Sequence, residues 1–409
     1  MVGNQLLAQR QTTSPFSRYG YGDIYTNTTA YNQAMGGISV GLLSPTQINL
    51  VNPAHQSSIK GETFLFNVGL GANIRKAEEN NVSATQTSAG IESFSLAFPI
   101  IPNRLGCAVG MLPFNSVGYN MSYSDSLAQY SYKGDGGINQ FVLSTGVRIF
   151  KGLSLGANMA YLFGTTNYTG ENFFEESSAF YSRKDLEYKT TGFLWGLGLQ
   201  YNWKINEEET LTFGATWKKE QSLSYKATET FNSYIISGVT EIGKDTITQN
   251  ITRAHTDIPN ELALGIGFKA ENKYVLGIDA GLQNWEDISC YGTKDKNLTT
   301  TKYIKLGGEL VPDYKSSKFY KRIPIRLGAH YADLPVIFAS EGKTAQAQEY
   351  GVTIGSQIKS RHTQNSLALA VDFGSRGNKS LAKSLHETYM QIKINVTLQE
   401  VWFSKRKIN

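Results

Sequence analysis

The histidines are the side chains whose chemistry would be easiest to recognise, because imidazole serves both as a general base and as a metal ligand. Five are present, without the short spacing that metal-binding histidines share. They are His55, His255, His330, His362 and His386. His255 stands two residues before Asp257, and a hydrolase would need such a pair beside a nucleophile. Isolated His–Asp neighbours in polar segments are usually solvated, so we expect no catalytic residue and no enzyme.

An acidic cluster is the next candidate, because carboxylates bind calcium. Glu171, Glu175 and Glu176 lie together, with Asp185 and Glu187 nearby. Their spacing does not match the calcium-binding loop of an EF-hand. We therefore expect a solvated loop, with no metal and no cofactor.

Two glycine pairs resemble phosphate-binding loops only superficially. They are Gly196 with Gly198 and Gly265 with Gly267. A phosphate loop joins a strand to a helix, and neither pair has that context. Glycines inside strands that face an enclosed lumen explain them better.

The composition favours long β-strands. Any functional residue must therefore be positioned by such strands. The chain of 409 residues has 40 Gly and only 10 Pro, and charged residues make up 18%. Proline removes a donor from a strand ladder, so its scarcity suits uninterrupted strands. The counts exclude collagen, coiled coils, disorder and disulfide scaffolds. The net charge of +5 is too dilute to indicate nucleic acid as a partner.

Apolar and polar residues alternate along most of the chain after residue 60. Between residues 386 and 403, Met390, Ile392 and Ile394 share one face, and Gln391 and Lys393 share the other. About fourteen such segments follow one another, joined by short turns and by long polar connections in alternation, such as 168–187 and 230–257. This pattern predicts an all-β fold: a transmembrane antiparallel β-barrel of about 14 strands over residues 61–409. A soluble all-β protein is the alternative.

The charged residues lie on the face opposite to the apolar one. A charge that faces lipid near the bilayer midplane costs roughly 2–4 kcal/mol. We therefore predict that these polar residues face the lumen: Arg148, Lys269, Asp279, Arg326, His330, Asp372 and Lys393.

The chain before the first strand lacks the alternation. Residues 1–8 look like the remnant of an export signal, with Ala8 near its cleavage site. Residues 9–60 are predicted to form a hatch that plugs the lumen. An even number of strands places both termini in the periplasm.

Three short motifs carry a resemblance to a known family. They are Met35-Gly36-Gly37, Asn52-Pro53-Ala54 and the closing WFSKRK at residues 402–407. With the barrel, they resemble the FadL/TodX family of outer-membrane transporters, in particular its Bacteroidetes-type branch. The resemblance implies a small N-terminal hatch inside the barrel and a kink in the third strand that opens the wall sideways. We expect the first two motifs to anchor the hatch.

The third predicted strand carries a proline in its middle. Proline inside a strand is confined to edges and bulges, so the residues and the resemblance indicate the same place for a lateral opening. A plain bulge without an opening is the alternative. The predicted segment comprises Leu112, Pro113, Phe114, Asn115 and Ser116.

Two functions remain open at this point. The first is passive uptake of small hydrophobic molecules across the outer membrane, with lateral exit at the kink. The second is a non-transporting barrel subunit of a secretion or barrel-assembly complex that docks partner proteins through its outer loops. The expected partners are the lipid bilayer, a hydrophobic small molecule, detergent or lipid, and other outer-membrane proteins.

Overall fold

The structure is a computed structural model, which describes residues 12–79, 82–174, 180–237, 240–340, 342–360, 364–378, 381 and 384–401. The predicted signal remnant at residues 1–8 and the closing motif at residues 402–407 lie outside the described residues. No helix in the described part is both long and apolar enough to span a bilayer.

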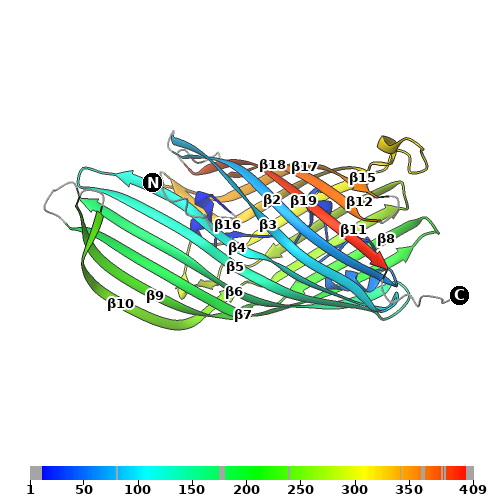
Figure 1. Cartoon of the computed structure of the whole chain (residues 1–409), viewed down its shortest axis with the longest axis horizontal. Helices are drawn as coiled ribbons and strands as arrows, with labels where there is room; N and C mark the ends of the chain where they lie inside the picture. The colour runs from blue at the N-terminus through cyan, green and yellow to red at the C-terminus, as the bar shows by residue number, and fades with distance from the viewer. Residues whose placement is uncertain are drawn as a thin grey trace.

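Within the described residues, 14 antiparallel strands close into one barrel (Figure 1), which confirms the predicted fold class. Strand β19 pairs with β2 and closes the ring. Two strands are each broken once, at residues 219–220 and 259–260, so β8 and β9 form one strand and β10 and β11 another. The first eight elements are β2 (Thr63–Glu79), β3 (Val82–Ile101), β4 (Leu105–Ser124), β5 (Ala128–Arg148), β6 (Leu153–Phe174), β7 (Tyr181–Lys204), β8 (Glu209–Lys218) and β9 (Gln221–Ser237). The others are β10 (Thr240–Ile258), β11 (Glu261–Ala270), β12 (Tyr274–Gln283), β15 (Thr301–Leu310), β16 (Ile325–Ser340), β17 (Lys343–Lys359), β18 (Ser366–Gly377) and β19 (His386–Val401).

The long polar connections are mostly strand. Residues 168–187 and 230–257 were expected to be loops, but β6 continues to Phe174 and β10 already begins at Thr240. Outside the membrane both faces of a hairpin are wet, so the apolar alternation disappears while the backbone ladder continues. Two short pieces in the connection from β12 to β15, β13 (Ser289–Cys290) and β14 (Thr293–Lys294), form a small hairpin of their own. A single turn, η3 (Phe319–Arg322), lies between β15 and β16.

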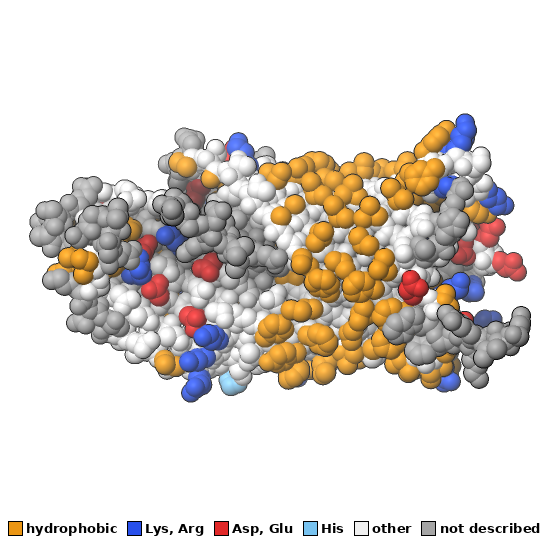
Figure 2. Space-filling model, viewed as in Figure 1, with side chains coloured by type: hydrophobic (Ala, Val, Ile, Leu, Met, Phe, Trp, Pro, Cys, Tyr) orange, Lys and Arg blue, Asp and Glu red, His pale blue; other side chains and the backbone are white. Residues whose placement is uncertain are grey.

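An apolar band surrounds part of the barrel. Figure 2 shows hydrophobic side chains gathered across the wall, with charged side chains on both sides of the band. Leu264 is 58% exposed and Leu276 is 55% exposed on this outer surface. Arg326, in contrast, is only 1% exposed. Lipid solvates the outward leucines, whereas a charge must face inward to find polar partners.

The segment before β2, which was predicted to be the hatch, packs against the inner face of the barrel wall. It contains η1 (Pro15–Arg18), β1 (Asp23–Ile24), α1 (Ala30–Gln33) and η2 (Pro53–Ser58). Lumen-facing glycines give it room: a Cβ on Gly146 would lie 2.5 Å from the Pro53 carbonyl, and one on Gly265 would lie 2.4 Å from the Gly41 nitrogen. Glycines in the wall therefore allow the backbone of the hatch to approach the strands closely.

Candidate functional site

The ladder between β3 and β4 ends partway along both strands. It runs from Ile101 opposite Leu105 to Phe94 opposite Met111. Beyond this point, among the described residues, β3 pairs only with β2, while β4 keeps its pairing with β5. The hydrogen-bonded ladder of the wall thus has a gap between β3 and β4 that begins at the level of Phe94.

A β-bulge marks each strand at the gap. On β3, Ser93 pairs with Gly69 and Ile91 with Leu70, so Glu92 is the extra residue. On β4, Pro113 pairs with Asn139 and Asn115 with Ile138, which leaves Phe114 as the extra residue. Bulges bend a strand and change the direction of its side chains, and proline has no N–H for a ladder.

The hatch covers the edge of β4 in this gap. Asp23 and Ile24 of β1 pair with Ser116 and Asn115, and the Tyr25 N–H donates to the Phe114 carbonyl over 2.9 Å. The Asn115 side chain accepts from the Ile138 N–H over 2.6 Å and donates to the Tyr21 carbonyl. Strand β1 of the hatch therefore pairs with β4 where β3 no longer does.

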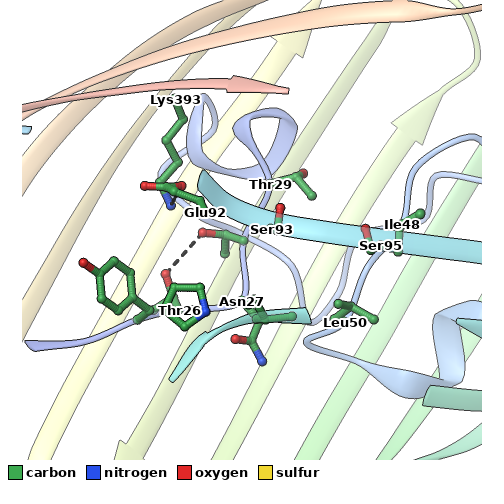
Figure 3. Close-up of a pocket in the computed structure, with 13 residues that line it drawn as sticks. Thr26, Asn27, Thr29, Ile48, Leu50, Glu92, Ser93, Ser95 and Lys393 are labelled. Atoms are coloured by element: carbon green, nitrogen blue, oxygen red, sulfur yellow. Dashed lines mark hydrogen bonds and ion pairs between the residues drawn. The ribbon is translucent and has the colours of Figure 1, made fainter. Parts of the chain in front are cut away.

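A small cavity lies between the gap and the hatch (Figure 3). Its volume is about 30 Å³, enough for one or two waters and far below the roughly 300 Å³ of a ligand pocket. Apolar residues from the hatch and β4 form part of the wall, and hydroxyl groups form much of the rest. The lining residues are Tyr25, Thr26, Asn27, Thr28, Thr29, Ile48, Leu50, Glu92, Ser93, Ser95, Leu112, Pro113 and Lys393.

An ion pair crosses this cavity. Figure 3 shows Lys393 of β19 extending toward Glu92 of β3, and their Nζ and Oε2 atoms are 3.2 Å apart. Lys393 lies opposite Gly71 in the ladder, and a Cβ on Gly71 would come within 2.1 Å of the Glu92 carboxylate. The glycine leaves the space through which the two side chains meet.

A buried ionic cluster fixes the hatch just before it enters the gap. Arg376 Nη1 lies 2.9 Å from Asp23 Oδ1, and its Nε lies 2.9 Å from Glu387 Oε1. Arg75 contacts the same two carboxylates over 3.3 and 3.0 Å. Burial alone would raise the pKa of Asp23, but the charges of Arg376 and Arg75 outweigh it and lower that pKa to about 2. The carboxylate therefore stays ionised and holds β1 in place.

The Met35-Gly36-Gly37 motif forms a tight turn against the barrel wall. Gly36 and Gly37 have φ angles of 69° and 81°, which favour glycine. A Cβ on Gly36 would lie 2.5 Å from the Leu306 carbonyl. Just after the turn, Asp279 of β12 accepts from the N–H groups of Ser39 over 2.5 Å and Val40 over 2.8 Å.

The Asn52-Pro53-Ala54 motif begins η2 near the short-turn end. The Asn52 side chain accepts from the Ala54 N–H over 3.1 Å and donates to the Leu199 carbonyl over 3.1 Å. One residue therefore caps the helix and ties it to β7. Gly198 makes this approach possible, since a Cβ there would lie 2.3 Å from Asn52 Oδ1.

The structure places the polar residues proposed for the lumen as follows. Asp279, Arg326, Asp372 and Lys393 are buried, and His330 lies 3.1 Å from the Tyr389 hydroxyl. Arg148 and Lys269 are half-buried near the short-turn end, and Arg148 reaches the Ser57 carbonyl of the hatch over 3.5 Å.

Sequence reasoning missed Arg75, Glu92, Arg376 and Glu387. Glu92 stands directly after Ile91 and breaks the alternation, which is the signal a bulge leaves in a sequence.

Comparisons with known proteins agree with this architecture. A model of the BamG family matches residues 1–409. A FadL homologue from Pseudomonas aeruginosa superposes with a TM-score of 0.62 at 12% identity, over 94% of this chain and 100% of that chain. The toluene transporter TodX of Pseudomonas putida gives 0.58 at 16% identity, over 93% and 99%.

A third solved structure, the CymD monoaromatic hydrocarbon channel, gives a TM-score of 0.57 at 15% identity, over 91% of this chain and 97% of that chain. At these identities the likeness establishes a shared FadL-like fold. No curated protein matches significantly. The Bacteroidetes-type branch and the positions of the termini stay predictions.

Proposed function

The chain belongs to the BamG family, and we propose that it is an outer-membrane barrel for passive uptake of small hydrophobic molecules, which leave sideways between β3 and β4. The observation that carries the proposal is the end of the β3–β4 ladder at Phe94 and Met111, directly beside a hatch strand. Those two residues are 42% and 47% exposed on the outer surface. A molecule that leaves above them enters lipid directly.

The polar interior supports an exit through the wall. The hatch fills the lumen below the gap, and its contacts there include charged and amide groups such as Asp279 and Asn52. An apolar molecule on that path would be surrounded by polar groups with which it cannot form hydrogen bonds, whereas in lipid it would be surrounded by hydrocarbon. A sideways exit avoids most of it.

The hatch strand explains how the gap can be closed at rest. Open sheet edges are unfavourable in hydrocarbon, because each unpaired backbone group costs several kcal/mol. Strand β1 covers the edge of β4 with three residues of the hatch. Opening so short a ladder breaks few backbone hydrogen bonds compared with the paired wall. The shared fold with proteins described as a toluene transporter and a monoaromatic hydrocarbon channel supports the same function.

Uptake by the purified barrel in lipid vesicles containing outer-membrane lipids tests this proposal. Pro113→Val should restore a donor to β4, narrow the gap and lower the uptake of a hydrophobic dye several-fold, while small polar solutes are unaffected. Pro99→Val is the matched control, since Pro99 lies where β3 and β4 are paired. Dye uptake that is equal in wild-type and Pro113→Val barrels would exclude lateral exit at this place.

A second function is favoured by a different observation. The hatch is held by a buried ionic cluster, the cavity is about 30 Å³, and hairpins such as β9–β10 extend well past the apolar band. These features suit a non-transporting subunit of a secretion or barrel-assembly complex. Extraction of native membranes in mild detergent tests it. Partners recovered at stoichiometric amounts, together with vesicles that take up no dye, would favour this second function.

A further inference from the structure

The hairpin of β13 and β14 places one tyrosine inside the mouth of the barrel. Tyr291 occupies its tip with a φ of 51°, followed by Gly292 with a φ of 80°. A bulky residue with positive φ is an uncommon and strained conformation, which costs on the order of 1–3 kcal/mol. The contacts around Tyr291 must offset this cost.

Those contacts are aromatic rings from three separate parts of the chain. The Tyr291 ring stacks on Tyr188 of β7 at 4.1 Å between centroids and 18° between planes. Tyr225 of β9 meets it edge-on at 5.5 Å, and Tyr21 of the hatch does so at 5.4 Å. We call Tyr21, Tyr188 and Tyr225 the aromatic cage. Three rings thus contact Tyr291, one stacked and two in edge-to-face geometry, and both are arrangements that aromatic pairs prefer.

Few polar contacts retain the hairpin tip. The Tyr291 N–H donates to Thr256 Oγ1 over 2.8 Å, and the Tyr291 hydroxyl lies 3.5 Å from Thr166 Oγ1. The Thr256 hydroxyl also donates to the Ser289 carbonyl over 3.2 Å. The tip is exposed at residues 292–294, while Trp285 and Leu298 at the two bases of the connection are buried.

We propose that the aromatic cage is a binding site for a small neutral phenol, and that Tyr291 occupies it in place of the ligand. The cage fits a single ring, and the Thr166 hydroxyl lies where a ring hydroxyl would reach it. The rings and hydroxyls that contact Tyr291 in the described structure carry no charge. In transport, this site would be the first station of the proposed uptake, but its ability to bind does not depend on lateral exit.

The free molecule that corresponds to the tyrosine side chain is 4-methylphenol, so that compound is the natural probe. When a side chain of the protein occupies a binding site, the apparent affinity for a ligand equals the intrinsic affinity multiplied by the fraction of time for which the site is free. In the full-length barrel in nanodiscs, Tyr291→Ala should bind 4-methylphenol at least about tenfold more tightly than wild type by ligand-observed NMR. Tyr291→Phe should bind like wild type. Cyclohexanol, which lacks an aromatic ring, should gain much less from Tyr291→Ala.

Two results of this titration would overturn the proposal. One is equal affinity of Tyr291→Ala and wild type for 4-methylphenol. The other is an equal gain for cyclohexanol, which would indicate an unspecific cavity. Empty nanodiscs correct for partition of the probes into lipid.

A native cysteine gives a second readout in the wild-type chain. Cys290 neighbours Tyr291, and burial raises the pKa of its thiol to about 12, so it reacts slowly while the tip is down. Saturating 4-methylphenol should speed alkylation of Cys290 several-fold and leave that of the buried Cys107 unchanged, as measured by peptide mass spectrometry. No change at Cys290 would contradict the proposal even if Tyr291→Ala failed to fold. Binding without dye uptake would contradict the proposed function alone, and dye uptake without binding would contradict the cage alone.

Discussion

Lys393 of β19 and Glu92 of β3 form an ion pair of 3.2 Å across β2, beside the place where β3 parts from β4. Their side chains are 6% and 16% exposed. A buried charge left without its partner is costly, so the two residues depend on each other. The pair fixes the bulge of β3 and with it one side of the gap.

Lys393→Met should therefore destabilise the barrel by roughly 3–5 kcal/mol, because it leaves the Glu92 carboxylate buried and unpaired. Urea unfolding in vesicles measures the change. The double variant Lys393→Met, Glu92→Gln should recover most of the loss, and a double variant as unstable as the single one would contradict the pairing.

Gly36→Ala should loosen the hatch, because its Cβ would meet the Leu306 carbonyl at 2.5 Å and its φ is 69°. Gly342→Ala is the matched control, with a φ of 76° and open space around it. Limited proteolysis of the folded barrel should cut the hatch much faster in Gly36→Ala than in Gly342→Ala. Equal rates of hatch cleavage in the two variants would contradict the claim that the close approach at Gly36 holds the hatch.

The hatch should be less stable in acid because of His55. Burial lowers the pKa of His55 to about 4, while its Nε2 accepts from the Ser44 N–H over 3.2 Å. An unfolded histidine binds a proton near pH 6.5, so the stability contributed by neutral His55 is present above that pH and is lost as the pH falls toward 4. The loss amounts to about 3 kcal/mol at most.

Unfolding free energies of wild type and His55→Gln, measured from pH 7.5 to pH 4, check this. The wild type should lose more stability over that interval than the variant. Parallel curves would show that His55 does not titrate with the predicted shift.

Leu264→Arg should destabilise the barrel by roughly 2–4 kcal/mol, because this leucine is on the outward apolar face of β11 and is 58% exposed. Ile251→Arg is a useful comparison, since Ile251 is 56% exposed but lies on the outer hairpin of β10. There the arginine would face water and cost little. A similar loss in both variants would place the membrane elsewhere on the barrel.

The strands could be predicted from the sequence because lipid on one side and a polar lumen on the other impose a period of two. The same alternation gave the inward direction of Asp279 and Arg326. It gave no information on partners, because Arg376 and Asp23 are 353 residues apart and meet only when β18 encloses the hatch. The alternation also gives a wrong direction for the side chain of Glu92, because the bulge there changes the register of β3.

Pro113 shows where composition and structure complement each other. Its missing N–H predicted an irregularity in the third strand. Only the structure shows that the bulge next to it coincides with the loss of pairing to β3 and with the docking of β1. A proline can mark a break in a ladder, but it cannot specify which segment covers the exposed edge.

The central claim, that hydrophobic molecules leave where β1 covers β4, is tested most directly by a reversible crosslink. Ile24 and Asn115 are opposite each other in the β1–β4 pair, close enough for a disulfide in an Ile24→Cys, Asn115→Cys barrel whose native cysteines are replaced by serine. Asn120→Cys, Lys133→Cys on the paired strands β4 and β5 is the control. We predict that oxidation of the first pair lowers dye uptake into vesicles several-fold and that reduction restores it, while the control is unaffected. Equal uptake by the oxidised and reduced forms of the first pair would contradict the account.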